Sequence, residues 1–253
     1  MELSLRLGAK EEANGPVNII SSFSKINDES KATISNNHWP KSYKDSFNKL
    51  KSAKLFNGEA GKSFSFHLED GSTVVTLGLG DKSKLSFEGL RKQTASLFTL
   101  IKNDFTEIAF DLDSFKVGSN LEKTLYTMAE SLHLTNYRYD THLTKKTNNS
   151  LKKVSFHSTA KANQKNKLES QLNKAQLVGE SVNIARDYVN EPPNVLNSEE
   201  YAKRLKKDSE KISGVKVKVL GKTDLKKEKA GLFLSVNNGS AYDPKLVHLT
   251  YTP

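Results

Sequence analysis

Cysteine is absent from the 253 residues, which excludes disulfide frameworks and thiolate metal sites. The sequence also has no apolar run of about eighteen residues, so it predicts no membrane-spanning helix. Its N-terminus lacks a basic head followed by a long apolar stretch. Residues 1–12 instead alternate, with Leu3, Leu5 and Leu7 on one face, which is typical of a strand rather than of a signal peptide. With no cysteine and no leader, we expect a cytoplasmic protein.

Complete catalytic patterns are absent as well. Neither an H-E-x-x-H metal motif nor a G-x-S-x-G nucleophile elbow occurs. The histidines are scattered, and no two stand four residues apart on a predicted helix; they are His38, His67, His133, His142, His157 and His248. We expect the three in strand patterns, His67, His157 and His248, to be hydrogen-bonded structural residues. The residues alone therefore predict no catalytic centre and no metal site.

Two glycine-containing segments approach phosphate-binding motifs without completing them. Gly58 and Gly61 enclose two residues, whereas a phosphate-binding loop needs four, and a strand pattern follows them instead of a helix. Gly78-Leu79-Gly80 follows a strand pattern, but Ser83 stands where a dinucleotide fingerprint needs its third glycine. We expect a tight turn at residues 78–80.

Negative charge is scarce. The formal net charge is +10 and the isoelectric point is near 9.4. Residues 141–174 hold eight lysines against one glutamate, and residues 203–229 hold eleven basic residues against four acidic ones. A solvated lysine-rich face is one interpretation, and a surface for nucleic acid or another polyanion is the second. The interleaved aromatic and arginine side chains of a stacking platform are missing.

Strand and helix patterns alternate through the first 160 residues, which predicts a layered α/β domain. Strands are predicted at residues 17–21, 62–68, 73–79, 107–112 and 151–156, and helices at 41–56, 86–103 and 121–132. Residues 62–68 and 73–79 read as a hairpin across the turn Asp70-Gly71. The polar, lysine-rich residues 140–150 are predicted to form an exposed loop.

A long linker helix at about residues 161–190 and a second unit at 191–253 are predicted next. The helix carries a continuous apolar stripe of Leu168, Leu172, Ala175, Val178, Val182, Ala185 and Val189. Pro192 and Pro193 must end it. Asn197 or Ser198 is predicted to cap a following helix, with Tyr201, Leu205 and Ile212 inward. Strands are predicted at 215–220, 232–236 and 246–251, and the sheet looks unfinished at Pro253.

The segment NIARDYVNEPPNVLN, residues 183–197, resembles the leucyl (cytosolic) aminopeptidase family, in which a long helix ends in such a stretch before the catalytic domain. The matching positions are Ala185, Arg186, Asp187, Asn190, Pro192, Pro193 and Asn194. We interpret these residues as structural, since each suits a helix ending. The resemblance implies a macro-like three-layer N-terminal domain over residues 1–160 and the first strands and helices of an α/β catalytic domain from residue 191.

The resemblance further implies a hydrolase that removes N-terminal residues from peptides with two divalent metals, Zn or Mn, and assembles as a hexamer. The family's metal ligands lie in a G-K-G-x-x-x-D-S-G-G motif and an N-T-D-A-E-G-R motif, and neither occurs here. No catalytic or metal-binding residue can therefore be assigned, and we expect the 253 residues alone to bind no metal and to be inactive. The alternative hypothesis is a basic macro-like module that binds nucleic acid or acts in oligomer assembly or regulation, without a membrane.

Overall fold

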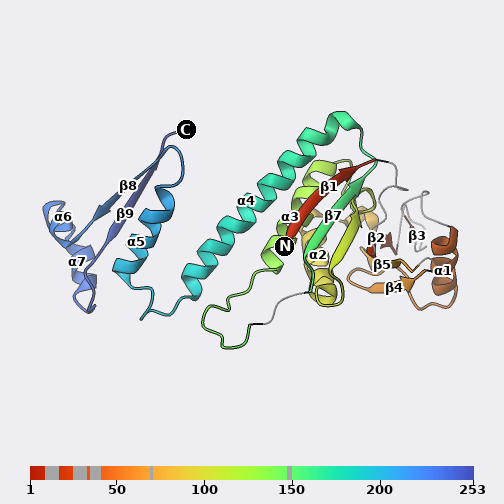
Figure 1. The fold of residues 1–253 in the computed structure, drawn as a ribbon, viewed down its shortest axis with the longest axis horizontal. Coiled ribbons are helices and arrows are strands. Elements are labelled where there is room, and N and C mark those ends of the chain that lie inside the picture. The colour runs from red at the N-terminus through yellow and green to blue at the C-terminus, as the bar shows by residue number, and fades with distance from the viewer. Residues whose placement is uncertain (9–16, 25–32, 35–40, 69–70, 147–149) are drawn as a thin grey trace. The chain divides into compact units, whose positions relative to one another are not determined.

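The computed structural model describes residues 1–8, 17–24, 33–34, 41–68, 71–146 and 150–253. The chain divides into two compact units, Met1–Asn183 and Ile184–Pro253. Figure 1 shows the helices and strands of both. In the described parts of the chain, no helix has the length and apolar character needed to cross a membrane. His38, Asp70 and part of the predicted loop at 140–150 lie outside the described residues.

The first unit contains a mostly parallel sheet. Its described strands are β1 (Glu2–Leu7), β2 (Val17–Phe23), β3 (Thr33–Ile34), β4 (Ser63–His67), β5 (Thr73–Gly78), β6 (Glu107–Asp111) and β7 (Lys153–Ser158). Their order is β1-β7-β6-β2-β5-β4, with β3 beside β2. The strands β1, β7, β6, β2 and β5 run parallel, whereas β4 pairs antiparallel with β5. The predicted hairpin and the predicted N-terminal strand are thus confirmed.

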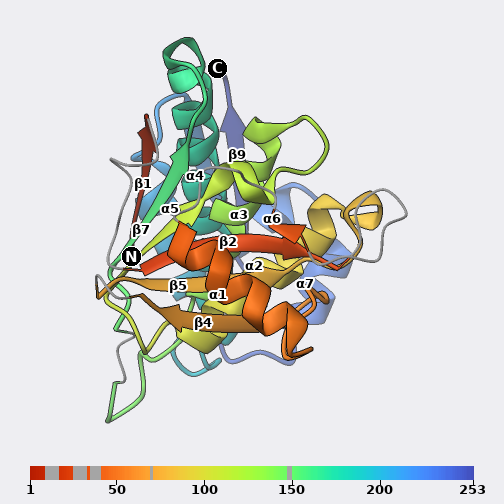
Figure 2. The ribbon, with the colours of Figure 1, turned by 90° about the vertical axis from the view of Figure 1, so that its right-hand side faces the viewer.

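Apolar side chains of the sheet form two clusters on its two faces. Ile19 and Val75 belong to the larger cluster, which also contains the buried residues of three helices. Their sequence neighbours Ile20 and Val74 belong to the smaller one, with Tyr43 of a fourth helix. Since successive strand residues point to opposite faces, helices cover both sides of the sheet. This layering confirms the predicted α/β fold class, and Figure 2 shows α1 in front of β2, β5 and β4.

The helices of the first unit are α1 (Lys41–Ser52), α2 (Phe87–Ile101), α3 (Leu121–Thr135) and most of the long α4 (Lys165–Asn190), whose last turns, from Ile184, belong to the second unit. Side chains cap two of their starts, since Ser86 Oγ accepts from Gly89 N at 3.0 Å and Asn120 Oδ1 accepts from Lys123 N at 2.8 Å. Helices α2 and α3 are further joined by Arg91, which lies 2.7 Å from the Glu130 carboxylate. The caps stabilise the starts of α2 and α3, and the partly buried ion pair links the two helices to each other.

The apolar stripe of α4 is continuous in sequence, but only its first half is buried. Leu168, Leu172 and Ala175 lie in the larger cluster, whereas 39% of Val182 and 83% of Val189 are exposed. Periodicity alone shows that a face is apolar and does not show how far along the helix that face is covered. The helix was predicted at about residues 161–190; it ends at Asn190 as predicted but begins at Lys165, after a 3-10 turn at Ala162–Gln164.

The second unit consists of α5 (Ser198–Ser209), β8 (Val215–Leu220), α6 (Lys222–Lys227), α7 (Gly231–Asn237) and β9 (Leu246–Tyr251). The predicted cap is confirmed, because Asn197 Oδ1 accepts from Glu199 N at 3.1 Å and from Glu200 N at 3.0 Å. The strands β8 and β9 pair antiparallel, with Val217 opposite Leu249. Both strands were predicted from their sequences.

Two predictions for the second unit are wrong. Residues 232–236 form helix α7 instead of a strand, because a short apolar run carries no alternation that would distinguish the two structures. A left-handed Lys229, with φ of 54°, turns the chain directly out of α6 into α7. Tyr201, Leu205 and Ile212 were predicted to point inward, but Tyr201 and Ile212 are 42% and 56% exposed and Leu205 is half-buried. The buried residues of α5 are Ala202 and Ser209.

Candidate functional site

The segment that resembles the aminopeptidase family ends α4 and forms the turn into α5. The last helical hydrogen bond runs from Glu191 N to Asp187 O at 3.0 Å. Pro192 and Pro193 have no N–H donor with which to continue the helix. The Pro192 carbonyl instead accepts from Val195 N and Leu196 N, both at 2.9 Å. The two prolines therefore end α4 in a short turn, and this turn leads to Asn197, the N-cap residue of α5.

Ion pairs fasten this turn to α5. Arg204 donates to Glu200 Oε1 at 2.9 Å and to Glu191 Oε1 at 3.2 Å. The hydrogen bonds that Arg204 donates to Glu200 and Glu191 raise the pKa of Arg204, and the bond that Glu200 accepts from Arg204 lowers the pKa of Glu200. Only 10% of the Glu191 side chain is exposed, so its link to Arg204 is the better shielded of the two.

An aromatic contact adds to the same junction. The rings of Tyr188 and Tyr201 meet edge to face with centroids 5.3 Å apart. The Tyr188 hydroxyl donates to Asp208 Oδ2 at 3.4 Å, and Lys211 Nζ lies 2.8 Å from the other oxygen of that carboxylate. Partial burial, followed by the negative charge of Asp208, raises the pKa of Tyr188, whereas Lys211 lowers the pKa of Asp208.

The predicted motif residues lie together along the end of α4 and the turn. Arg186 and Pro192 are half-buried; the exposed members are Ala185, Asp187, Asn190, Pro193 and Asn194. Their arrangement at a helix ending agrees with a structural role, and that role stays a prediction. They form no set of converging acids, bases and nucleophiles of the kind that a catalytic centre needs.

The described residues contain no group of three or more histidine, aspartate or glutamate side chains that could hold a metal ion. His67 Nδ1 lies 3.1 Å from Thr73 Oγ1 on the neighbouring strand, a structural contact. His133 lies on α3, His157 is buried in β7, and His248 is exposed on β9. The described residues therefore offer no set of ligands for the two metals of an aminopeptidase, and we assign no metal-dependent step to them.

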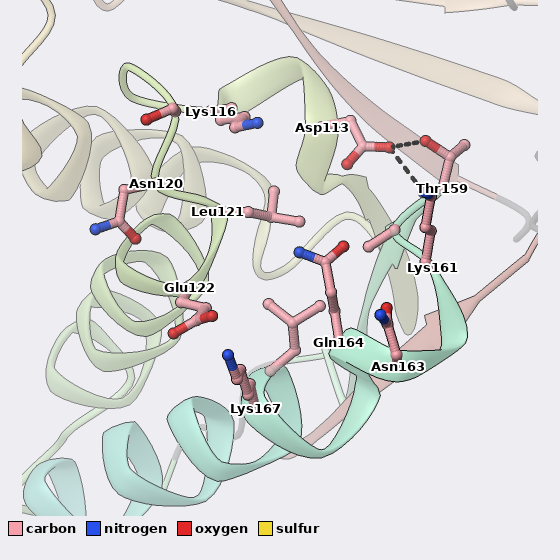
Figure 3. A pocket seen from close by; sticks show the side chains of 13 residues that line it. Asp113, Lys116, Asn120, Leu121, Glu122, Thr159, Lys161, Asn163, Gln164 and Lys167 are labelled. Atoms are coloured by element: carbon pink, nitrogen blue, oxygen red, sulfur yellow. Dashed lines mark hydrogen bonds between the residues drawn. The ribbon is translucent and has the colours of Figure 1, made fainter.

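A pocket of about 1000 Å³ lies beyond the carboxyl ends of the parallel strands β6 and β7 (Figure 3). Sequence patterns did not predict it. Its lining combines residues 113–122, which lead from β6 into α3, with residues 159–168, which lead from β7 into α4. Figure 3 shows Leu121, Gln164 and Lys167 pointing into the space between the starts of these two helices. Ligands of open parallel sheets commonly bind beyond the carboxyl ends of the strands.

One wall of the pocket is fixed by the Asp113 carboxylate. Asp113 Oδ1 accepts from Ser158 Oγ at 2.6 Å, and Oδ2 accepts from Thr159 N and Thr159 Oγ1, both at 2.8 Å. Ser158 Oγ in turn accepts from Ala160 N at 3.1 Å. These bonds hold the loop after β7 against the loop after β6.

Comparison with known proteins assigns both units to one family. Residues 21–146 match the model of the cytosol aminopeptidase family, N-terminal domain, and residues 183–253 match that of the catalytic domain. A probable cytosol aminopeptidase of Persephonella marina is 29% identical over 209 residues, which are 81% of this chain and 41% of the relative. That of Prochlorococcus marinus is 31% identical over 201 residues, 78% of this chain and 39% of the relative.

Solved structures agree in fold. A mutant of tomato leucine aminopeptidase superposes with a TM-score of 0.81 at 19% identity, over 100% of this chain and 51% of its own. The bottromycin maturation enzyme BotP superposes with a TM-score of 0.73 at 19% identity, over 95% of this chain and 47% of its own. The chain spans about two fifths of the length of the curated relatives it matches. With both domain models matched in order, and with the family's helix-ending motif at their junction, the chain belongs to the cytosol aminopeptidase family.

Proposed function

We propose that this chain is the N-terminal portion of a two-metal leucyl aminopeptidase that removes N-terminal residues from peptides. The observation that carries the proposal is the order of the two domain matches, with the N-terminal domain ahead of the start of the catalytic domain. The curated relatives are named as probable cytosol aminopeptidases, which supports this activity. The N-terminal layered domain would be macro-like.

The metals, Zn or Mn, would be bound outside these 253 residues. One structure similar in fold is a BotP complex with Mn, which supports divalent metal chemistry in the whole enzyme. Neither metal motif of the family occurs in the printed sequence. We therefore expect the 253-residue chain to hydrolyse no leucine p-nitroanilide, with or without added Mn²⁺ or Zn²⁺.

The test compares two preparations. An antibody raised against the recombinant 253-residue chain is used to purify the protein from cells that make it, and both preparations are assayed with leucine p-nitroanilide. We expect hydrolysis by the cell-derived protein that chelator abolishes and Mn²⁺ restores, and none by the recombinant chain. A cell-derived protein of 28.2 kDa without activity, or metal-dependent activity of the recombinant chain, would overturn the proposal.

We also propose a cytoplasmic location and a hexameric assembly for the whole protein, as the family resemblance implies. The names of the relatives support the location. Light scattering on the cell-derived protein tests the assembly, since six copies of the whole protein would give a single high-mass species. A monomer at micromolar concentration would contradict it.

A further inference from the structure

We propose that the pocket between the starts of α3 and α4 binds a small phosphorylated sugar or polyol. The pocket belongs wholly to the first unit, and its volume of about 1000 Å³ lies at the upper end of the range for small-molecule sites. Such binding would give the N-terminal domain a ligand of its own.

Lysines supply the positive charge. Lys116 comes from the loop before α3, Lys161 from the loop after β7, and Lys167 from the first turns of α4. Within the described residues, none of the three makes an ion pair, whereas nearby Lys165 lies 3.8 Å from the Glu169 carboxylate. Since these amines have no ion-pair partner among the described residues, each is open to an anionic ligand, and the Coulomb attraction grows with the charge of that ligand.

Two acidic residues, Asp113 and Glu122, line the same pocket as the three lysines, so one net positive charge remains. The Asp113 carboxylate already accepts three hydrogen bonds from Ser158 and Thr159. Glu122, half-buried at the start of α3, is the remaining acid of the lining. Its carboxylate is an acceptor for ligand hydroxyl groups, and the amides of Asn163 and Gln164 can both donate and accept. The lining therefore matches a ligand with one anionic end and several hydroxyl groups.

Nucleotides fit this lining poorly. The apolar lining residues are Leu121, Ala160 and Leu168, and none of the lining side chains in the described chain is aromatic. A nucleobase would lack the flat ring on which bases commonly stack. A phosphorylated polyol without a base needs no aromatic surface. Its phosphate suits the lysines, and its hydroxyl groups suit the amides and Glu122.

The experiment titrates the full 253-residue chain with ribose 5-phosphate, ribose, inorganic phosphate and AMP, by calorimetry and by ¹⁵N amide shifts. We expect ribose 5-phosphate to bind more tightly than inorganic phosphate, ribose not to bind, and AMP to gain nothing from its base. Shifts should centre on residues 116–122 and 159–167. Equal affinity for inorganic phosphate, much tighter AMP binding, or no binding at millimolar ligand would each overturn the proposal.

Substitutions distinguish binding in the pocket from non-specific attraction of an anion to the basic surface. The double variant Lys161→Gln, Lys167→Gln should weaken ribose 5-phosphate binding about a hundredfold, about tenfold per charge-assisted bond lost. Lys165→Gln removes one positive charge at the start of α4, outside the pocket lining, and should leave the affinity unchanged. Glu122→Gln removes the carboxylate acceptor for the ligand hydroxyl groups, so it should weaken ribose 5-phosphate binding severalfold and should not weaken inorganic phosphate binding. Weakening by Lys165→Gln equal to that of the double variant, or unchanged or tighter ribose 5-phosphate binding by Glu122→Gln, would contradict the assignment.

Discussion

At the scale of single residues, Gly179 sets how closely α4 approaches α3. A Cβ at this position would lie 2.5 Å from His133 Cβ, and Asn183 Nδ2 donates to the His133 carbonyl at 3.3 Å one turn later. Gly179→Ala should therefore destabilise the first unit by roughly 1–2 kcal/mol, since overpacking outweighs the gain in helix propensity. Urea unfolding monitored by circular dichroism measures the change.

Gly231→Ala is the matched control, because a Cβ there would have no neighbour within 4 Å. This second substitution should be neutral or stabilise α7 by about 0.5–1 kcal/mol. Equal effects of the two substitutions would show that contact with His133 does not limit the position.

Also at the residue scale, His133 makes stability depend on pH. Burial lowers the pKa of His133 below its usual value, and Glu180 only partly offsets this. The folded chain thus binds fewer protons at this site than the unfolded chain does. Stability should fall as the pH drops through the ordinary histidine pKa of about 6.5 toward the lower folded-state value.

His133→Gln should flatten this dependence between about pH 7.5 and 5.5, as urea midpoints would show. His248→Gln, at an exposed position on β9, should leave the slope unchanged. A slope that survives His133→Gln would assign the pH dependence to other groups.

At the scale of secondary structure, α5 depends on its cap. Asn197→Ala removes the acceptor for Glu199 N and Glu200 N and should destabilise the second unit by about 1 kcal/mol. Asn194→Ala is the control, because the Asn194 side chain is exposed and makes no hydrogen bond to a described residue. Thermal melting followed by circular dichroism would compare the two, and equal losses would mean that the turn, rather than the cap, limits stability.

Most elements could be predicted because their patterns are local. The alternation of Leu3, Leu5 and Leu7 and the Asn197 cap with its acidic first turn are complete within a few residues. The strand predicted at residues 232–236 is a helix, because five mostly apolar residues fit a strand and a buried helix equally well. The apolar stripe of α4 is exposed over its second half, because the burial of a helix face depends on residues far away in the sequence.

At the scale of the whole molecule, the pocket could not be predicted from sequence. Its two halves, 113–122 and 159–168, are brought together only by the parallel pairing of β6 with β7. No periodicity or motif links them, and lysine, asparagine and glutamine are ordinary surface residues. The family motif was visible because its residues are contiguous.

The whole-molecule charge also bears on nucleic acid. Several basic residues of the 203–229 stretch are in ion pairs: Lys203, Arg204, Lys206, Lys211 and Lys222. We expect no discrete complex with duplex DNA in a mobility-shift assay at about 150 mM salt, because these ion pairs reduce the positive charge that the 203–229 stretch offers to phosphates and salt screens the rest. A discrete complex that persists at that salt would favour the basic-module alternative.

The pairing of β1 with β7 has a consequence for synthesis on the ribosome. Glu2 lies opposite Lys153 and Leu7 opposite Ser158, so the first strand to be made pairs with the last strand of its sheet. At translation rates of about 5–20 residues per second, β1 waits on the order of ten seconds for its partner. During that interval its three leucines lack the strand beside which they pack in the folded unit, so β1 stays an unpaired apolar segment until β7 has been made.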